Sequence, residues 1–185
     1  MALYSDDCGR PAPAHARNGT NARTAALPMY LECEDIVLAG RDLYDRELRL
    51  SKHTSTAWLE MRLAAERDGL DLRAVSGFRS VQRQMQILPR KARMGQAMVD
   101  PLKVNAVPGY SQHHSGCALD LTDAANYDDP LREESEEQPV FNWLTVNAAT
   151  FGFRLEHTRD NIYGFVYEPW HWFLSGVPNC MIANW

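Results

Sequence analysis

The chain has 185 residues, and 45% of them are hydrophobic, which is enough for one domain with a buried core. The formal net charge of -5 is modest and no basic patch with interleaved aromatic residues occurs, so nothing indicates a nucleic-acid partner. No segment approaches the roughly 18 consecutive apolar residues of a membrane span. We therefore expect a compact monomer without a membrane-spanning segment.

Residues 1–28 are rich in Ala, Arg, Asn, Thr and Pro and lack periodic hydrophobic residues. This composition predicts a flexible N-terminal arm, followed by a single domain at residues 29–185. The arm also lacks the apolar core of about 7 to 15 residues that a secretory signal needs. This absence favours a cytoplasmic protein, although a protein of the periplasm or cell envelope could have lost its leader.

Helical and extended patterns follow one another in the first half of this domain. Apolar residues at helical spacing predict a core helix over 57–69, and 72–76 is a short strand candidate. Ser80 is expected to cap a second helix that runs until Pro89, and the following stretch to Val107 is ambiguous and could continue this helix. Three apolar residues of that helix share one face by their spacing: Val81, Met85 and Leu88.

The second half of the domain continues this mixture. A helical stripe over 139–149 is closed by Gly152, and the segments 153–155 and 164–173 predict two antiparallel strands. The acidic run 133–137 is expected to form a solvated loop. Helices that precede and separate a small set of strands predict an α+β fold, in which helices pack on one side of a small antiparallel sheet.

Two short segments contain the residue types of a catalytic metal site. The segment 111–120 contributes His113 and Asp120, and a second segment some fifty residues later contributes Glu168 and His171. Two histidines and an aspartate can bind zinc, with the glutamate as general base. Zinc that keeps its fourth position for water lowers the pKa of that water to about 7. A lone histidine of this kind is more often packed or on the surface, but the joint pattern has few accidental matches and predicts hydrolysis.

The spacing within these segments indicates strands and turns. Gly116 marks a turn into a strand on which Ala118 and Asp120 share one face, which would place the zinc site on the sheet. Pro169 argues against a helix in the second segment and favours a strand with a local bend. Neighbouring side chains on a strand point in opposite directions, so His114 is expected at the pocket rim or the surface.

At these residues the sequence resembles the zinc D,D-carboxypeptidases and dipeptidases typified by VanY and VanX, which act on the peptide stems of bacterial cell-wall precursors. Their pattern Ser-x-His-x-x-Gly-x-Ala-x-Asp, followed by Glu-x-Trp-His, is matched at every fixed position: Ser111, His113, Gly116, Ala118, Asp120, Glu168, Trp170 and His171. A third element, Ser-x-Tyr-Arg-Ser-x-x-x-Gln, is matched from Ser76 to Gln84, with Phe78 in place of the commoner Tyr. The resemblance covers about residues 40–175.

The resemblance implies a role for each matching residue. His113, Asp120 and His171 would bind Zn²⁺. Glu168 would take a proton from the zinc-bound water and later deliver it to the departing amine. Arg79 would polarise the scissile carbonyl and stabilise the oxyanion.

Ser111 and Gln84 resemble the residues that hold the substrate's peptide or terminal carboxylate in similar enzymes. Each also has a purely structural interpretation. Ser111 follows Pro108 and Gly109 and could be a turn or capping residue, and Gln84 could be a solvated helix position.

The implied activity is that of a zinc metallopeptidase, a D-Ala-D-Ala carboxypeptidase acting on peptidoglycan stem peptides. L,D-carboxypeptidases and L-Ala-D-Glu endopeptidases share the motifs, because specificity is set by loops around the pocket. From another class, a related zinc site occurs in the signalling domain of hedgehog proteins, which is a binding module. The presence of both Glu168 and Arg79 favours an enzyme. A structural zinc domain is disfavoured, because such sites usually close all four positions with protein ligands.

The four cysteines are far apart and show no CxxC spacing, which argues against a zinc cluster or a dense disulfide framework. Cys117 is predicted to be a small buried apolar residue. A bridge from Cys33 to Cys8 or to Cys180 would require export.

Overall fold

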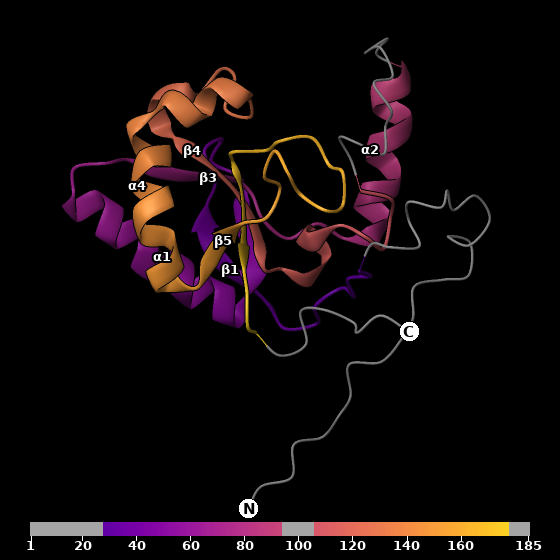
Figure 1. Cartoon of the computed structure of the whole chain (residues 1–185). Coiled ribbons are helices and arrows are strands. Elements are labelled where there is room, and N and C mark those ends of the chain that lie inside the picture. Colours follow the sequence, from indigo (N-terminus) through magenta and orange to yellow (C-terminus); the bar gives the residue numbers. More distant parts are fainter. Residues whose placement is uncertain (1–27, 94–105, 178–185) are drawn as a thin grey trace, which may run out of the picture.

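The computed structural model describes residues 28–93 and 106–177 (Figure 1). The arm predicted for 1–28 lies outside these ranges except for Pro28, and so do Cys8 and Cys180. Among the helices in the described ranges, none combines the length and the apolar character that crossing a membrane requires.

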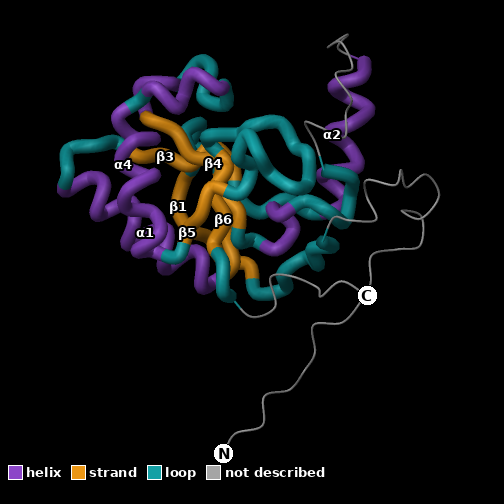
Figure 2. Tube along the Cα trace, in the orientation of Figure 1, coloured by secondary structure: helices purple, strands orange, loops and turns teal. Residues whose placement is uncertain are grey.

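A four-stranded antiparallel sheet forms the centre of the fold (Figure 2). In spatial order its strands are β3 (Leu72–Ser76), β4 (Ala118–Asp123), β6 (His171–Leu174) and β5 (Phe153–Leu155). A second antiparallel sheet pairs β1 (Ile36–Arg41) with β2 (Glu47–Ser51). The α+β prediction is confirmed, and the strands predicted at 72–76 and 153–155 occur with these bounds.

The helices are α1 (Lys52–Arg67), α2 (Val81–Arg93) and α4 (Pro139–Asn147), with 3-10 turns η3 (Gln112–Ser115), η4 (Ala124–Asn126), η5 (Glu133–Glu137) and η6 (Ala148–Phe151). Helix α1 starts earlier than predicted because the Ser51 side chain caps it, accepting a hydrogen bond from the Thr54 backbone N–H. It ends before Gly69, whose φ is +81°. Helices α1 and α4 contact the strands from one side, as predicted, whereas α2 lies on the opposite side of the molecule (Figure 1).

An apolar core fixes the two strands that carry predicted site residues. It includes large side chains that are almost completely buried: Leu50, Met61, Leu119, Leu144 and Phe153. Burying a side chain of this size contributes about 1.5–3 kcal/mol relative to leaving it exposed. Residues of β4 and β6 belong to this core together with residues of α1 and α4, so apolar packing helps to position both strands.

The register of the central sheet brings distant residues together. Asp120 pairs with His171 across β4 and β6, and with Ser76 across β3 and β4. Directly opposed residues on antiparallel strands have Cβ atoms only about 4.5–5.5 Å apart. Sheet pairing alone thus places a predicted ligand of the first segment beside one of the second.

Helix α2 differs from its prediction. Within residues 81–87, Gln84 is the buried residue, at 1% exposure, whereas Met85 is 42% exposed. The helix starts as expected, with the Ser80 hydroxyl accepting a hydrogen bond from the Arg83 N–H, but it continues past Pro89 to its end at Arg93. A proline removes one backbone donor without necessarily ending a helix. The alternative interpretation of Gln84 as a solvated helix position was wrong, because polar partners inside the fold draw its side chain inward.

The segment 164–173 is not one strand, because only His171–Leu174 belongs to β6. Gly164 has a φ of +67°, and the His171 N–H donates to the Glu168 carbonyl, which closes a turn. A left-handed residue and a tight turn are incompatible with a continuous strand. Glu168 consequently lies in the loop that enters β6, with its N–H bonded to the His157 carbonyl.

The acidic run is mostly exposed, as predicted, but it forms the turn η5 and anchors the loop before β6. The guanidinium of Arg159 donates to both carboxylate oxygens of Glu136 at 2.9 Å, and the Tyr167 hydroxyl donates to Glu136 at 2.8 Å. Arg159 also lies 3.8 Å from the centre of the Tyr167 ring. These contacts hold the residue before Glu168 against η5.

Cys117 directly precedes β4 and is completely buried, as predicted. It is also disulfide-bonded. The prediction of a simple apolar residue was therefore incomplete, because its sulfur forms a covalent cross-link in addition to packing in the core.

Candidate metal centre and active site

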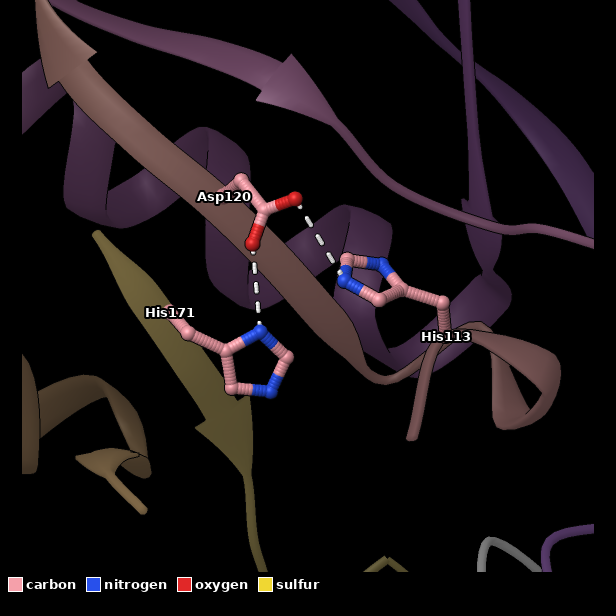
Figure 3. Close-up of side chains that lie close together, drawn as sticks. All are labelled: His113, Asp120 and His171. Carbon is pink, nitrogen blue, oxygen red and sulfur yellow. Dashed lines mark hydrogen bonds and ion pairs between the residues drawn. The ribbon is translucent and has the colours of Figure 1, made fainter. Parts of the chain in front are cut away.

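Three predicted ligands from three separate elements meet in one buried cluster (Figure 3). His113 comes from η3, Asp120 from β4 and His171 from the start of β6, and each is at most 5% exposed. Their candidate ligand atoms all lie within 4.8 Å of one another. Nε2 of His113 is 3.4 Å from Oδ2 of Asp120, and Nδ1 of His171 is 3.1 Å from Oδ1 of Asp120.

The hydrogen bonds of the two rings orient them for metal binding. Nδ1 of His113 donates to the Gly77 carbonyl at 2.7 Å, and Nε2 of His171 donates to the side-chain oxygen of Gln112 at 2.7 Å. In a neutral imidazole the other nitrogen then carries a lone pair. Both lone pairs face Asp120, and the hydrogen bonds at the opposite nitrogens hold the rings as expected for metal-binding histidines.

The charges in the cluster also suit a cation. Burial opposes ionisation of Asp120, but the neighbouring rings of His113 and His171 lower the pKa of this carboxyl well below its usual value. Burial, assisted by the neighbouring His157, lowers the pKa of His171 to about 4. At neutral pH the cluster therefore contains a carboxylate and a neutral imidazole of His171, the protonation states that bind metal.

This donor set fits zinc. Lone pairs directed at an ionised carboxylate repel it unless a cation lies between them. Tetrahedral zinc with bonds of 2.0–2.1 Å places its ligand atoms about 3.3 Å apart, close to the observed 3.1 and 3.4 Å. Two imidazole nitrogens and a carboxylate provide three ligands, which leaves a fourth position open, as in catalytic rather than structural sites.

A second group of possible ligands, His157, Glu168 and His171, does not form a comparable site. The rings of His157 and His171 are stacked, with 4.3 Å between centroids and 10° between planes. Imidazole lone pairs lie in the plane of the ring, so two parallel rings cannot direct them at one ion. His157 instead donates from Nδ1 to Oε2 of Glu168 at 2.6 Å.

Glu168 lies beside the zinc-type cluster and does not point into bulk solvent. Its side chain is 12% exposed, and one carboxylate oxygen is within 4.8 Å of a ring nitrogen of His171. The hydrogen bond from His157 fixes this carboxylate. From the sequence, His157 was expected near the start of the final hairpin, where it could approach the site, but it was assigned no role there. The fold brings it next to Glu168 and into the lining of the cavity.

Arg79 approaches the same cluster from the loop after β3. Its Nη2 is 4.0 Å from Oδ2 of Asp120, and its Nη1 donates to Oε1 of Gln84 at 3.1 Å. Nε2 of Gln84 donates to the Ala106 carbonyl at 2.7 Å. Both ends of the buried Gln84 amide thus bond within the protein, and its position holds the guanidinium in place.

His114 is neither at the pocket rim nor on the surface, so that prediction was wrong. It is completely buried, its Nδ1 donates to the Arg79 carbonyl at 2.6 Å, and its Nε2 accepts from the Gly109 N–H at 3.1 Å. The prediction assumed an extended backbone, whereas η3 is a 3-10 turn that directs His114 inward. His114 therefore ties the loop carrying Arg79 to the loop before η3.

The cluster opens into a cavity of about 280 Å³. Its lining includes the predicted site residues Arg79, Ser111, His113, Asp120, Glu168 and His171. It also includes aromatic side chains: Tyr30, Tyr110, Tyr163, Phe165 and Trp170. Trp170, which directly precedes the predicted ligand His171 in the motif, is thus part of the cavity wall. Ser111 is available to a ligand there, whereas Gln84 does not line the cavity.

A buried set of two histidines and one aspartate, opening on a cavity with a carboxylate and a guanidinium, is typical of metal-dependent hydrolases. The comparison of sequences makes the class more specific. The chain belongs to the VanY family of D-alanyl-D-alanine carboxypeptidases, whose family model matches residues 47–177. The resemblance inferred from the motifs is thereby confirmed.

Individual relatives agree with this family. The chain is 30% identical to a putative carboxypeptidase YodJ of Bacillus subtilis, over 79% of this chain and 55% of the relative. It is 28% identical to a D-alanyl-D-alanine carboxypeptidase of Enterococcus faecium, over 83% of this chain and 46% of the relative. The chain thus spans about half the length of these two relatives.

Solved structures share the fold. The LdcB LD-carboxypeptidase superposes with a TM-score of 0.69 at 28% identity, covering 78% of this chain and 70% of that one. VanYB in complex with D-alanine-D-alanine superposes with a TM-score of 0.59 at 27% identity, covering 70% of this chain and 73% of that one. A vancomycin-resistance D,D-pentapeptidase VanY in complex with Zn(II) superposes with a TM-score of 0.63 at 25% identity, covering 83% of this chain and 89% of that one.

Proposed function

We propose that the protein is a zinc-dependent carboxypeptidase that hydrolyses the C-terminal peptide bond of peptidoglycan stem peptides ending in D-Ala-D-Ala. The observation that carries the proposal is the convergence of His113, Asp120 and His171 on one side of a cavity that Glu168 and Arg79 also line. Membership of the VanY family supports the reaction class. The complex of the similar VanYB with D-alanine-D-alanine supports the substrate.

In this proposal His113, Asp120 and His171 hold the zinc. Bound zinc supplies Lewis acidity, which makes hydroxide available near neutral pH. Glu168 accepts the proton of the attacking water and then delivers it to the amine of the departing residue. The hydrogen bond from His157 keeps this carboxylate in one orientation through both proton transfers.

Arg79 stabilises the negative charge that develops on the scissile carbonyl oxygen. Its guanidinium is held by Gln84, and its backbone N–H donates to the His113 carbonyl at 3.1 Å. A cation that is fixed before the reaction needs no reorganisation as charge develops, and this makes electrostatic stabilisation effective. Ser111 lines the cavity and is proposed to contact the substrate's peptide or carboxylate. Gln84 is proposed to act on the substrate only through Arg79.

The purified protein should be incubated with three substrates: D-Ala-D-Ala dipeptide, a stem pentapeptide ending in D-Ala-D-Ala, and a stem tetrapeptide ending in a single D-Ala. Mass spectrometry of the products, with and without a metal chelator, identifies the bond that is cut. We expect D-Ala release from the pentapeptide, its loss with chelator and its recovery with added zinc.

The same assay separates the competing functions. Likeness to the LdcB LD-carboxypeptidase makes the tetrapeptide the critical comparison. Release of D-Ala from the tetrapeptide alone would identify an L,D-carboxypeptidase, and cleavage between L-Ala and D-Glu would identify an endopeptidase. Zinc binding without turnover of any peptide would indicate a binding module of the hedgehog type and contradict the proposal.

A further inference from the structure

We infer that Gln112 is a positioning residue that selects the tautomer of His171. Gln112 lies in η3 directly before His113, and its side chain reaches across to β6. Its Oε1 is 2.7 Å from Nε2 of His171, and both residues are buried. In the sequence pattern this position is variable, so the motif assigns it no role.

A tautomer has to be selected because His171 faces two acceptors. Its Nδ1 is 3.1 Å from the ionised Oδ1 of Asp120, while its Nε2 faces the amide oxygen of Gln112. A neutral imidazole has one N–H to donate. If the proton were on Nδ1, it would bond to Asp120 and occupy the lone pair that the zinc site needs. A carbonyl-type oxygen at Nε2 favours the opposite tautomer, in which Nδ1 is the ligand atom.

The orientation of the Gln112 amide is supported by a second contact. Its Nε2 donates to the hydroxyl of Tyr30 at 3.1 Å, which turns the Oε1 end toward His171. Tyr30 is buried, and its backbone N–H donates to the Gly109 carbonyl at 2.9 Å. The chain from Tyr30 through Gln112 to His171 therefore links the segment before β1 to the proposed metal ligand.

This inference rests on the proposed zinc site, and its test reads metal binding and tautomer rather than turnover. Gln112→Met preserves side-chain length but removes the amide oxygen, whereas Gln112→Glu retains an acceptor at that position. Zinc affinity is measured by competition with a chromophoric chelator. NMR of ¹⁵N-histidine-labelled protein shows which nitrogen of His171 carries the proton.

We expect Gln112→Met to weaken zinc binding by about 10- to 100-fold, the usual cost of losing a residue that hydrogen-bonds to a metal ligand. In the zinc-free variant the His171 proton should shift toward Nδ1. Gln112→Glu should keep both the wild-type affinity and the proton on Nε2. The exposed Gln82 provides a matched control, because Gln82→Met should change neither quantity.

Wild-type zinc affinity and an unchanged His171 tautomer in Gln112→Met would overturn the inference. So would a Gln112→Glu variant that binds zinc as weakly as Gln112→Met. If Gln112→Met does not fold, Tyr30→Phe tests the same series of hydrogen bonds from Tyr30 through Gln112 to His171. An unchanged zinc affinity and His171 tautomer in Tyr30→Phe would also overturn the inference. A wild-type protein that binds no zinc would instead contradict the proposed function, so the two failures are distinguishable.

Discussion

His157 contacts His171 and Glu168 at the same time. Its ring stacks on that of His171 at 4.3 Å between centroids, and its Nδ1 donates to Glu168 at 2.6 Å. Phe165 also stacks on His157, at 4.6 Å. A single side chain thereby sets the position of the proposed general base relative to a proposed zinc ligand.

Replacing His157 by Phe should preserve the ring stack and remove the hydrogen bond to Glu168. We expect kcat for D-Ala release to fall by about 10-fold or more, because the carboxylate loses its fixed orientation, while zinc affinity stays at the wild-type value. Steady-state kinetics and a chelator competition measure the two effects. His157→Asn retains a hydrogen-bond donor and should recover part of kcat. Equal kcat in His157→Phe and the wild type would show that His157 does not orient the Glu168 carboxylate.

Glu168→Gln should retain zinc and lose most turnover. The amide cannot accept the proton of the attacking water, and positioned general bases contribute about 10²- to 10⁴-fold in rate. Metal analysis and product release are measured on the same sample. The exposed Glu134 provides the control, because Glu134→Gln should leave both unchanged. Undiminished turnover in Glu168→Gln would exclude it as the base.

Arg79→Lys keeps the positive charge but should still lower kcat by about 10²- to 10³-fold, the usual effect of losing an oxyanion-stabilising group. A lysine ammonium lacks the planar fork with which Arg79 donates to Gln84 while facing the cluster, so the charge is no longer fixed. Initial rates with the stem pentapeptide measure the loss. Arg83→Lys, on the exposed face of α2, serves as the control. Wild-type kcat in Arg79→Lys would show that any cation suffices.

The stability of the zinc-free protein should decrease as the pH falls below about 6.5. Burial is the main cause that lowers the pKa of His171 from 6.5 to about 4, so the unfolded chain binds this proton at a higher pH than the folded protein does. The corresponding stability is fully present above pH 6.5 and is lost between pH 6.5 and about 4. A shift of this size corresponds to about 3 kcal/mol.

Urea unfolding in the presence of chelator, at a series of pH values, measures this effect. The carboxyl of Asp120, whose pKa is also lowered in the folded state, should add a further loss below about pH 3.8. His171→Asn lacks the titrating ring and should show a flatter profile between pH 6.5 and 4. Parallel profiles for this variant and the wild type would contradict the assignment to His171.

Gly116→Ala should destabilise the protein. Gly116 has a φ of +67°, and an added Cβ would lie 2.6 Å from Cδ1 of Ile36 and 2.8 Å from the backbone nitrogen of Ser51. We expect a loss of about 1–3 kcal/mol from backbone strain, increased by this overlap. Gly69 has a φ of +81° and open space around its Cβ position, so Gly69→Ala measures the cost of backbone strain without overlap. Thermal unfolding should therefore show a larger loss for Gly116→Ala than for Gly69→Ala.

Short-range patterns were sufficient for much of the fold. The helical spacing of Trp58, Met61 and Ala65 predicted α1, and all three are buried. Gly152 ends the helical segment before β5 with a φ of +83°. These features depend on neighbours within one or two turns, so the sequence shows them directly. The motif spacing likewise identified the three candidate ligands that the fold brings together.

The sequence by itself determined which residue types are available for a zinc site and several of the elements, among them α1, β3 and β5. Only the tertiary structure decided that His114 is buried, that Gln84 holds Arg79, and that Gln112 and His157 contact His171. These contacts join residues that different elements carry. Their positions follow from strand register and from packing across the core, which the period of a single helix or strand does not encode.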